Sequence, residues 1–341
     1  MTQKIGFLSF GHYGDYPGSK TRTGADMLHQ AIDLAVGAED IGLDGAFYRV
    51  HHFAQQQMSP FPLLAAAAAR TSTIELGTGV IDMRYENPLY MAEQAAMVDL
   101  IAGNERLQLG ISRGSPETVY KGFAHFGYLP AEGEDEADMA RRHTALFREA
   151  IAGKGIAQSV SDPTQLDPIT PQSPGLPRRI WWGASTRDTA RWTGEQGMNL
   201  MSSTLLLEDT GVPFDQLQAE QLRIFKQAWA DAGHEGTPRT SVSRSIIPII
   251  DEQSNYYFGL RAQAEGQDQV GILDGAVSRF GKSYIGEPDK IAEELAQDEA
   301  VAEADTLLVT IPNMLGVDFN LRQLEAIIRD IKPTLYPHPR P

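Results

Sequence analysis

Residues Ile74 to Gly114 read IELGTGVIDMRYENPLYMAEQAAMVDLIAGNERLQLGISRG, and this stretch decides the fold of the chain. β-Favouring residues surround the Gly77-Thr78-Gly79 segment, and glycines inside a strand usually mark a bulge or a close backbone approach. The pair Asn87-Pro88 suits the cap and first position of a helix, and a short apolar strand over 106–111 follows it. This strand–helix–strand order predicts parallel pairing, which would bring Gly79 and Arg113 close together at the strand ends.

The same alternation of strands and helices continues on both sides of this unit. Further strands are expected over 5–10, 46–50, 179–182, 198–202, 242–250 and 306–311. Eight strands alternating with helices predict an α/β fold, a (β/α)8 TIM-type barrel formed by one domain over residues 1–341. Residues 115–178 and 253–282 interrupt the alternation, and we expect them to be insertions at the carboxyl-terminal face. The Pro-rich segment from Pro163 to Pro177 would also suit a domain boundary, but the alternation resumes directly after it.

Composition excludes several classes of function. The chain has 341 residues, a formal net charge of −16 and no cysteine. The negative charge argues against nucleic acid and anionic membrane surfaces as partners, because both need a cationic footprint. The absence of cysteine excludes disulfides, thiolate nucleophiles and Cys-ligated metals, and it suits a reducing cytoplasm. The longest apolar run, Phe61 to Ala69, is far shorter than the roughly 20 residues that a membrane span requires.

The candidate site residues are those that directly follow a predicted strand, because active sites of such barrels lie at the carboxyl ends of the strands. His51 is one, and imidazole is the side chain whose ordinary pKa lies nearest neutrality. Its neighbour His52 points to the opposite face of an extended segment, so the two are poorly placed to share a metal ion. A buried, hydrogen-bonded histidine is the alternative interpretation of His51.

A second candidate is the turn from Gly183 to Thr189, which joins a strand to a helix. Free backbone N–H groups at a helix N-terminus, with hydroxyl groups beside them, bind phosphate without many cations. Simple N-capping by serine or threonine explains the same residues. Arg113 offers a guanidinium that matches phosphate oxygens, and a surface salt bridge is its alternative.

Several of these segments together resemble one family. LGTGV, NPLYMAEQAAMVDLIAGNERLQLGISRG, VHHF and the turn GASTRDT are similar to corresponding regions of the bacterial luciferase-like flavin-dependent monooxygenases. The resemblance implies that His51 is the acid/base residue and that Ser112 stands beside the reactive flavin carbon, where the luciferases proper carry cysteine. One departure is Val50, because the family often has an acidic residue there.

The resemblance also implies where a flavin would bind. Thr78, Gly79 and Val80 would lie beneath the ring, where the family often has an unusual peptide bond, here Gly79–Val80. The phosphate would be held by Arg113, Ser185, Thr186 and Thr189.

The function implied by the resemblance is an FMN-dependent monooxygenase. Reduced FMN from a separate flavin reductase would react with O2 to a flavin hydroperoxide that oxidises a small organic substrate, an aldehyde being one candidate. The expected enzyme is a cytoplasmic homodimer with no metal, no nucleic-acid partner and no membrane attachment.

Three other functions stay open from the sequence. A deazaflavin-dependent dehydrogenase shares the barrel, a non-catalytic protein would bind flavin without turnover, and a metal-dependent hydrolase would use the histidines. The aromatic residues between 120 and 128 suit either a substrate pocket or ordinary packing.

Overall fold

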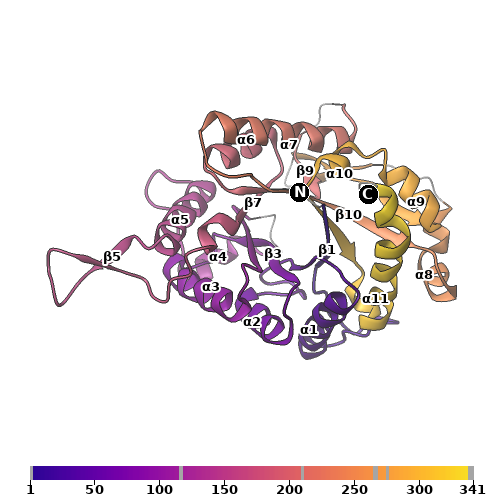
Figure 1. The fold of residues 1–341 in the computed structure, drawn as a ribbon, viewed down its shortest axis with the longest axis horizontal. Coiled ribbons are helices and arrows are strands. Elements are labelled where there is room, and N and C mark those ends of the chain that lie inside the picture. Colours follow the sequence, from indigo (N-terminus) through magenta and orange to yellow (C-terminus); the bar gives the residue numbers. More distant parts are fainter. Residues whose placement is uncertain (1–2, 115–117, 209–210, 264–267, 274–275, 337–341) are drawn as a thin grey trace, which may run out of the picture.

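The computed structural model describes residues 3–114, 118–208, 211–263, 268–273 and 276–336. Within these residues, eight parallel strands close into a barrel, which Figure 1 shows in a view nearly along the barrel opening. The strands, in their order around the barrel, are β1 (Lys4–Ser9), β2 (Gly45–Tyr48), β3 (Glu75–Asp82), β4 (Leu107–Ser112), β7 (Ile180–Ala184), β8 (Asn199–Ser202), β10 (Thr240–Pro248) and β14 (Thr306–Ile311). Pairing of β8 with the start of β10 closes the ring, and all eight predicted strands are confirmed.

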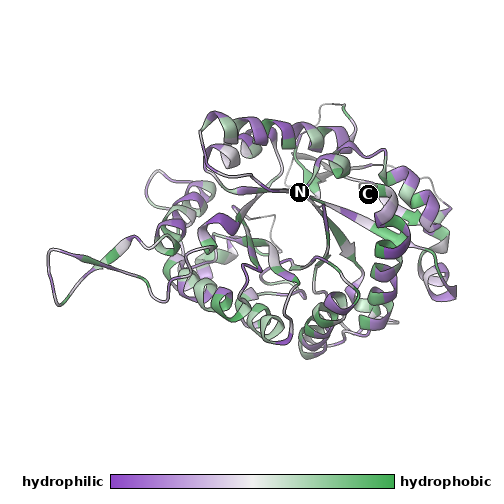
Figure 2. Ribbon diagram, viewed as in Figure 1, coloured by the Kyte–Doolittle hydropathy of each residue, from purple (hydrophilic) through white to green (hydrophobic). Residues whose placement is uncertain are grey.

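Helices surround the barrel and cover the outer face of its strands (Figure 1). They are α1 (Gly24–Asp40), α2 (Pro60–Arg70), α3 (Pro88–Ala102), α5 (Glu136–Ile151), α6 (Arg187–Glu195), α7 (Phe214–Asp231), α9 (Pro288–Leu295), α10 (Glu299–Glu303), α11 (Val317–Ala326), the π-helical turn η3 (Ile327–Ile331) and α12 (Lys332–Leu335). Figure 2 shows hydrophobic and hydrophilic residues alternating along helices such as α7, as amphipathic helices require. None of the helices in the described part of the chain is both long and apolar enough to cross a membrane.

The residues that begin and end α3 have the roles that the sequence predicted. The side chain of Asn87 accepts hydrogen bonds from the N–H groups of Leu89 and Tyr90, at 3.0 and 3.1 Å. Pro88 is the first residue of α3, where its missing N–H costs nothing. Gly103 ends the helix with a φ of 62°, a conformation that side-chain-bearing residues rarely adopt.

The barrel interior is a packed core rather than a pore. Its middle layer holds Leu8, Phe47, Trp181, Met201 and Leu308, all buried, with Phe10 and Val80 packed above them. Below this layer, the Trp181 indole N–H donates to the Gln108 amide oxygen, and Arg239 pairs with Glu75. Only the end of the barrel where the strands finish is therefore available for a ligand.

The two expected insertions contain more regular structure than the sequence suggested. The first holds the one-turn helix α4 (Gly122–His125), the hairpin β5 (Gly155–Gln158) and β6 (Leu166–Pro168), and the 3₁₀ turn η1 (Leu176–Arg179). The second, described as less regular from its sequence, holds α8 (Glu252–Ala262), β11 (Gln269–Leu273) and β12 (Ala276–Phe280). β12 also pairs with β9 (Leu205–Leu206). β13 (Ser283–Gly286) pairs with the later half of β10, and the 3₁₀ turn η2 (Asn313–Leu315) follows β14.

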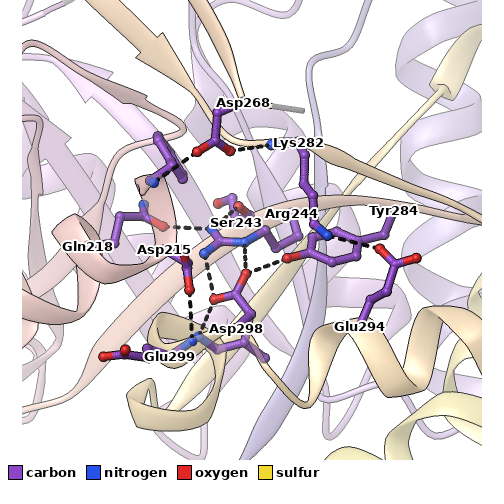
Figure 3. A network of polar contacts seen from close by, with 12 residues as sticks. Asp215, Gln218, Ser243, Arg244, Asp268, Lys282, Tyr284, Glu294, Asp298 and Glu299 are labelled. Atoms are coloured by element: carbon purple, nitrogen blue, oxygen red, sulfur yellow. Dashed lines mark hydrogen bonds and ion pairs between the residues drawn. The ribbon is translucent and has the colours of Figure 1, made fainter. Parts of the chain in front are cut away.

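A buried ion pair ties β10 to the helices outside it, as Figure 3 shows. The guanidinium of Arg244 donates to both carboxylate oxygens of Asp298, at 2.7 and 2.9 Å, and to the Gln218 side chain at 2.7 Å. The Tyr284 hydroxyl donates to the same carboxylate at 2.7 Å. Burial tends to raise the pKa of Asp298, but the Arg244 guanidinium, together with hydrogen bonds from Tyr284 and the Val301 N–H, lowers it overall. Because Arg244 points outward, Ser243 and Ser245 point into the barrel.

Candidate functional site

The end of β3 forms one wall of the barrel mouth. The peptide bond between Gly79 and Val80 is cis, which confirms the position expected for an unusual bond. The pairing of β3 with β4 also shifts register between Thr78 and Ile81. The Val80 side chain consequently packs on the interior cluster rather than on the outer helices.

The next two strands around the barrel, β4 and β7, carry small residues near the end of β3. A β-carbon placed on Gly183 would lie 3.2 Å from Cγ1 of Val80 and 3.4 Å from Cβ of Ser112. Val80, Ser112 and Gly183 therefore converge at one place, although they come from three separate strands. The Ser112 hydroxyl accepts a hydrogen bond from the Gly114 N–H at 3.0 Å. A hydroxyl that accepts in this way still has its own proton to donate.

The mouth is open to solvent above the interior cluster. Val80, Gly183, Ser243, Ser245 and Thr310 all belong to barrel strands and are partly exposed. The inward-facing Ser243 and Ser245 on β10 and Thr310 on β14 carry small hydroxyl-bearing side chains, and Ile247 follows on the same face of β10. Backbone and mostly short side chains therefore line this end of β3, β7, β10 and β14.

His52 packs against aromatic rings, whereas His51 makes no ring contact with the described residues. The His52 ring stacks on Tyr85, with 4.1 Å between centroids and 12° between planes. The imidazole of His51 makes no hydrogen bond to any described residue, so it is not the hydrogen-bonded core histidine of the alternative interpretation. Burial lowers the pKa of His51, and Arg49 lowers it further against the opposing effect of Asp82. His51 is therefore held neutral near pH 7, a form that can accept a proton.

The aromatic residues after β4 divide between the two expected roles. Phe123 is buried and packs with Tyr85 and Met139. Phe126 is 51% exposed and lies edge-on to the ring of His52, with 5.3 Å between centroids. Phe123 therefore belongs to the packing under the loop, whereas Phe126 forms an apolar rim beside the histidines.

Arg49 is a site residue that the sequence analysis missed. It follows β2 directly, and its N–H donates to the Ser9 carbonyl oxygen at 2.9 Å, so it continues the pairing with β1. Strand alternation places its side chain on the same face as Phe47, whose ring lies inside the barrel. The guanidinium carbon lies 4.9 Å from the centroid of Phe10. The alternation with Phe47 was the signal that could have identified it.

The first turn of α6 has the form expected of an anion site, but a carboxylate already reaches it. Thr186 caps the helix by accepting from the Thr189 N–H at 3.2 Å, and its hydroxyl donates to that of Thr189 at 2.9 Å. Ser185 precedes the cap and its hydroxyl makes no hydrogen bond to the described residues. Glu208 accepts from the Arg187 N–H at 3.0 Å. A phosphate here would have to share these donors with Glu208.

Two further predicted cofactor-binding residues have contrasting surroundings. Arg113 is exposed and forms no ion pair with any described residue, so the surface salt bridge of the alternative interpretation is not seen. The hydroxyl of Thr78 is fully buried and donates to the Gly110 carbonyl oxygen at 2.8 Å. Thr78 can therefore contribute to a ligand site through its backbone but not through its side chain.

Two acidic residues, Asp82 and Glu86, lie at and after the end of β3. Asp82 holds Arg84 through both carboxylate oxygens, with 2.7 Å to one guanidinium nitrogen. The Asp82 charge also acts on His51 and His52. Burial, reinforced by Asp82, raises the pKa of Glu86 to about 7. No carboxylate of the described chain hydrogen-bonds His51, so the residue that the family has before its histidine pair is not replaced by a direct contact.

Comparison with known proteins gives a family match and several curated relatives. The model of the luciferase-like monooxygenase family matches residues 4–257. An uncharacterised protein of Sinorhizobium fredii is 30% identical over 54% of this chain and 52% of its own length. The oxygenase component of a flavin-dependent trigonelline monooxygenase from Acinetobacter baylyi is 26% identical over 57% of this chain and 53% of its own length. The chain thus spans about half the length of these two relatives.

Other similarities extend over nearly the whole chain. A limonene 1,2-monooxygenase of Rhodococcus erythropolis is 29% identical over 98% of this chain and 88% of its own length. The FMN-bound oxygenating constituent of 3,6-diketocamphane monooxygenase from Pseudomonas putida has a TM-score of 0.71 at 16% identity, covering 98% of this chain and 99% of its own. A coenzyme F420-dependent tetrahydromethanopterin reductase from Methanopyrus kandleri has a TM-score of 0.65 at 16% identity, covering 98% and 100%. At these identities the two structures show a shared fold.

Proposed function

The chain belongs to the luciferase-like monooxygenase family, and from this premise we propose that it is a flavin-dependent monooxygenase that binds FMN in the barrel mouth. The observation that carries the proposal is the convergence of Val80, Ser112 and Gly183 beside the cis peptide bond. These residues present backbone and small side chains, against which a flat ring can lie. One barrel domain over the whole chain would hold the complete site.

The residues present fit FMN at both of its ends. Arg113 and Ser185 follow the neighbouring strands β4 and β7, and their side chains have no hydrogen-bond partner among the described residues, so both are available to a phosphate. A helix N-terminus adds favourable dipole and N–H donors beside them. Glu208 opposes the phosphate electrostatically, so binding would require its carboxylate to leave the Arg187 N–H. Thr186 and Thr189 would shape this turn through their mutual hydrogen bond.

The bound flavin would supply the oxidative chemistry, by activating O2 for transfer of one oxygen atom to an organic substrate. His51, held neutral by burial and by Arg49, would accept or return a proton at the edge of the mouth. Ser112 would donate its remaining hydroxyl proton toward the ring. Phe126, with the exposed Phe53 near it, would keep water from this side of the site.

The electron source and assembly follow from the same analogy. We propose that a separate flavin reductase supplies reduced FMN, as an oxygenase component in a relative's name suggests. We also propose, by the same analogy, that the protein forms a homodimer. A deazaflavin-dependent dehydrogenase is the second candidate, because an F420-dependent reductase shares this fold.

A titration separates these candidates. The purified protein is titrated with FMN, reduced FMN and F420, following flavin or deazaflavin fluorescence, and oxygen uptake is then recorded with reduced FMN and added reductase. The proposal expects micromolar binding of FMN or its reduced form and protein-dependent oxygen uptake. Binding of F420 alone would favour the dehydrogenase, and binding of none of the three would overturn both.

A further inference from the structure

Arg49 is partly buried, and it differs from the arginines that the fold buries fully. Arg84 pairs with Asp82, Arg179 with Asp99 and Arg244 with Asp298. Arg106 has no carboxylate, but it donates to backbone carbonyl oxygens and to the Thr71 hydroxyl. The guanidinium of Arg49, in contrast, makes no hydrogen bond or ion pair with any described residue, and its one recorded contact is the Phe10 ring.

The surroundings of Arg49 do not compensate its charge. Burial lowers the pKa of its guanidinium, and no acidic residue acts in the opposite direction. Its neighbours His12 and His51 are themselves basic, and Arg49 lowers the pKa of both. Because both histidines are neutral near pH 7, Arg49 supplies the positive charge at the edge of the mouth formed by β1 and β2, in a chain of net charge −16. Arg49 is only partly buried, and a cation that lacks an ion-pair partner in this position is available to a ligand that supplies the opposite charge.

The flavin phosphate is not suited to be that ligand. In the order β1-β2-β3-β4-β7-β8-β10-β14, Arg49 at the end of β2 lies three strands from β7, on which the phosphate turn follows. Ser185 lies in that turn, and Arg113 follows β4, two strands from β2. An anion held by Arg49 is consequently a second one, distinct from the phosphate.

We propose that Arg49 binds the carboxylate of the organic substrate, so that the enzyme acts on an organic acid whose other end extends toward Ser112 and Val80. The planar guanidinium offers paired N–H donors that match a carboxylate, and Phe10 covers one of its faces. A formal negative charge compensates the arginine more fully than a neutral carbonyl oxygen of the flavin ring would. This inference rests on the proposed function for the reaction, but the carboxylate site itself is testable without turnover.

The test uses the cofactor-free protein with benzoate and benzamide as probes, which differ in charge but hardly in shape. Binding is followed by saturation-transfer NMR and titration calorimetry for the wild type, Arg49→Gln, Arg49→Lys and the exposed control Arg70→Gln. Wild type should prefer benzoate to benzamide by about tenfold, and Arg49→Gln should abolish that preference, as expected for one charged hydrogen-bonded pair. Arg49→Lys should retain part of it, and Arg70→Gln all of it.

Three results would overturn the proposal: equal binding of benzoate and benzamide by wild type, no benzoate binding at low-millimolar concentration, or full preference in Arg49→Gln. FMN and riboflavin titrations identify the occupant. If Arg49→Gln binds FMN and riboflavin as tightly as wild type does, the result supports a substrate carboxylate at Arg49. A similar loss of affinity for both flavins would assign Arg49 to the flavin ring and would contradict the proposal. If wild type binds benzoate through Arg49 but binds no flavin, the proposed function fails and the carboxylate site stands.

Thermal unfolding distinguishes a binding residue from a structural one. Replacement of an unpaired, partly buried charge by a neutral side chain of similar length should raise the unfolding midpoint, because a residue kept for ligand binding costs stability. Arg49→Gln and Arg49→Met are therefore expected to unfold a few degrees higher than wild type. A clear decrease for both variants would show that Arg49 supports the fold, and would contradict the proposal.

Discussion

The carboxylate of Glu208 accepts a hydrogen bond from the backbone N–H of Arg187, 3.0 Å away, at the first residue of α6. It also pairs with the Arg187 guanidinium. A negative side chain thus holds the place where the proposed function puts a phosphate. The N-terminus of α6 attracts an anion in either case, and Glu208 and a phosphate would compete for it.

Glu208→Gln should therefore bind FMN more tightly. Removal of a like charge about 4 Å from the phosphate is worth about 1 kcal/mol even at the dielectric constant of water, so the Kd should fall by roughly fivefold or more. Riboflavin lacks the phosphate, so its affinity should hardly change. Both Kd values are measured by fluorescence titration at low and high salt, and the gain for FMN should shrink as salt increases. Equal gains for FMN and riboflavin would place the phosphate elsewhere.

Arg113→Ala combined with Ser185→Ala tests the two side chains that are proposed to bind the phosphate. The double variant should weaken FMN by about tenfold to a hundredfold, because a charged hydrogen-bonded contact is worth about 1.5–3 kcal/mol. Riboflavin binding is again the internal reference, and Arg191→Ala on the exposed face of α6 is the matched control. Equal losses for the two flavins would show that these residues do not contact the phosphate.

The proposed function assigns the proton chemistry to His51. His51→Asn should lower kcat by about 10² to 10⁴-fold, the usual range for a general acid or base, while FMN affinity stays nearly unchanged. Because burial and Arg49 lower the pKa of His51, the acid limb of the wild-type rate profile should fall below pH 6.5. Arg49→Gln removes the adjacent cation and should shift this limb to higher pH. His52→Asn, which changes a ring stacked on Tyr85, should leave the position of the limb unchanged.

Glu86 gives the protein a pH-dependent stability. Its pKa is raised from 4.5 to about 7, so the folded state keeps a proton that the unfolded chain releases. Stability should therefore fall as the pH rises from 4.5 through 7, by at most about 3 kcal/mol from this residue. Glu86→Gln cannot ionise, and it should be more stable than wild type at pH 8 but not at pH 4.5.

Chemical denaturation at the two pH values measures this difference directly. Glu235→Gln, an exposed carboxylate removed by the same substitution, serves as the control. A gain for Glu86→Gln that is the same at both pH values would mean that ionisation is not the cause.

The barrel could be predicted because its signals are local. Asn87, Pro88 and Gly103 mark the ends of α3 by their own side-chain chemistry, and apolar segments mark each barrel strand. The hairpin β5–β6 escaped prediction because its residues are mostly exposed and show no alternation of burial. α8 did carry a signal, the capping box formed by Asp251 and Ser254, which the surrounding irregular sequence obscured.

The site was predictable only where adjacent residues in the sequence form it. His51, the Gly79–Val80 bond and the Ser185–Thr189 turn stand in short motifs, and the resemblance to a family gave the position of the cis bond. Glu208 reaches α6 from a later loop, so no local pattern relates it to Arg187. Arg49 was overlooked because a charged residue beside a buried strand suggests a strand end rather than an inward side chain. The interior position of Phe47 reveals its direction.

A crystal structure of the protein soaked with FMN tests the central claim most directly. The account predicts difference density for the tricyclic ring against Gly79–Val80, beside Ser112 and Gly183, with the phosphate between Arg113 and Ser185 and Glu208 displaced from the Arg187 N–H. Density for the flavin at any other place, or a barrel mouth without flavin density at saturating FMN, would contradict it.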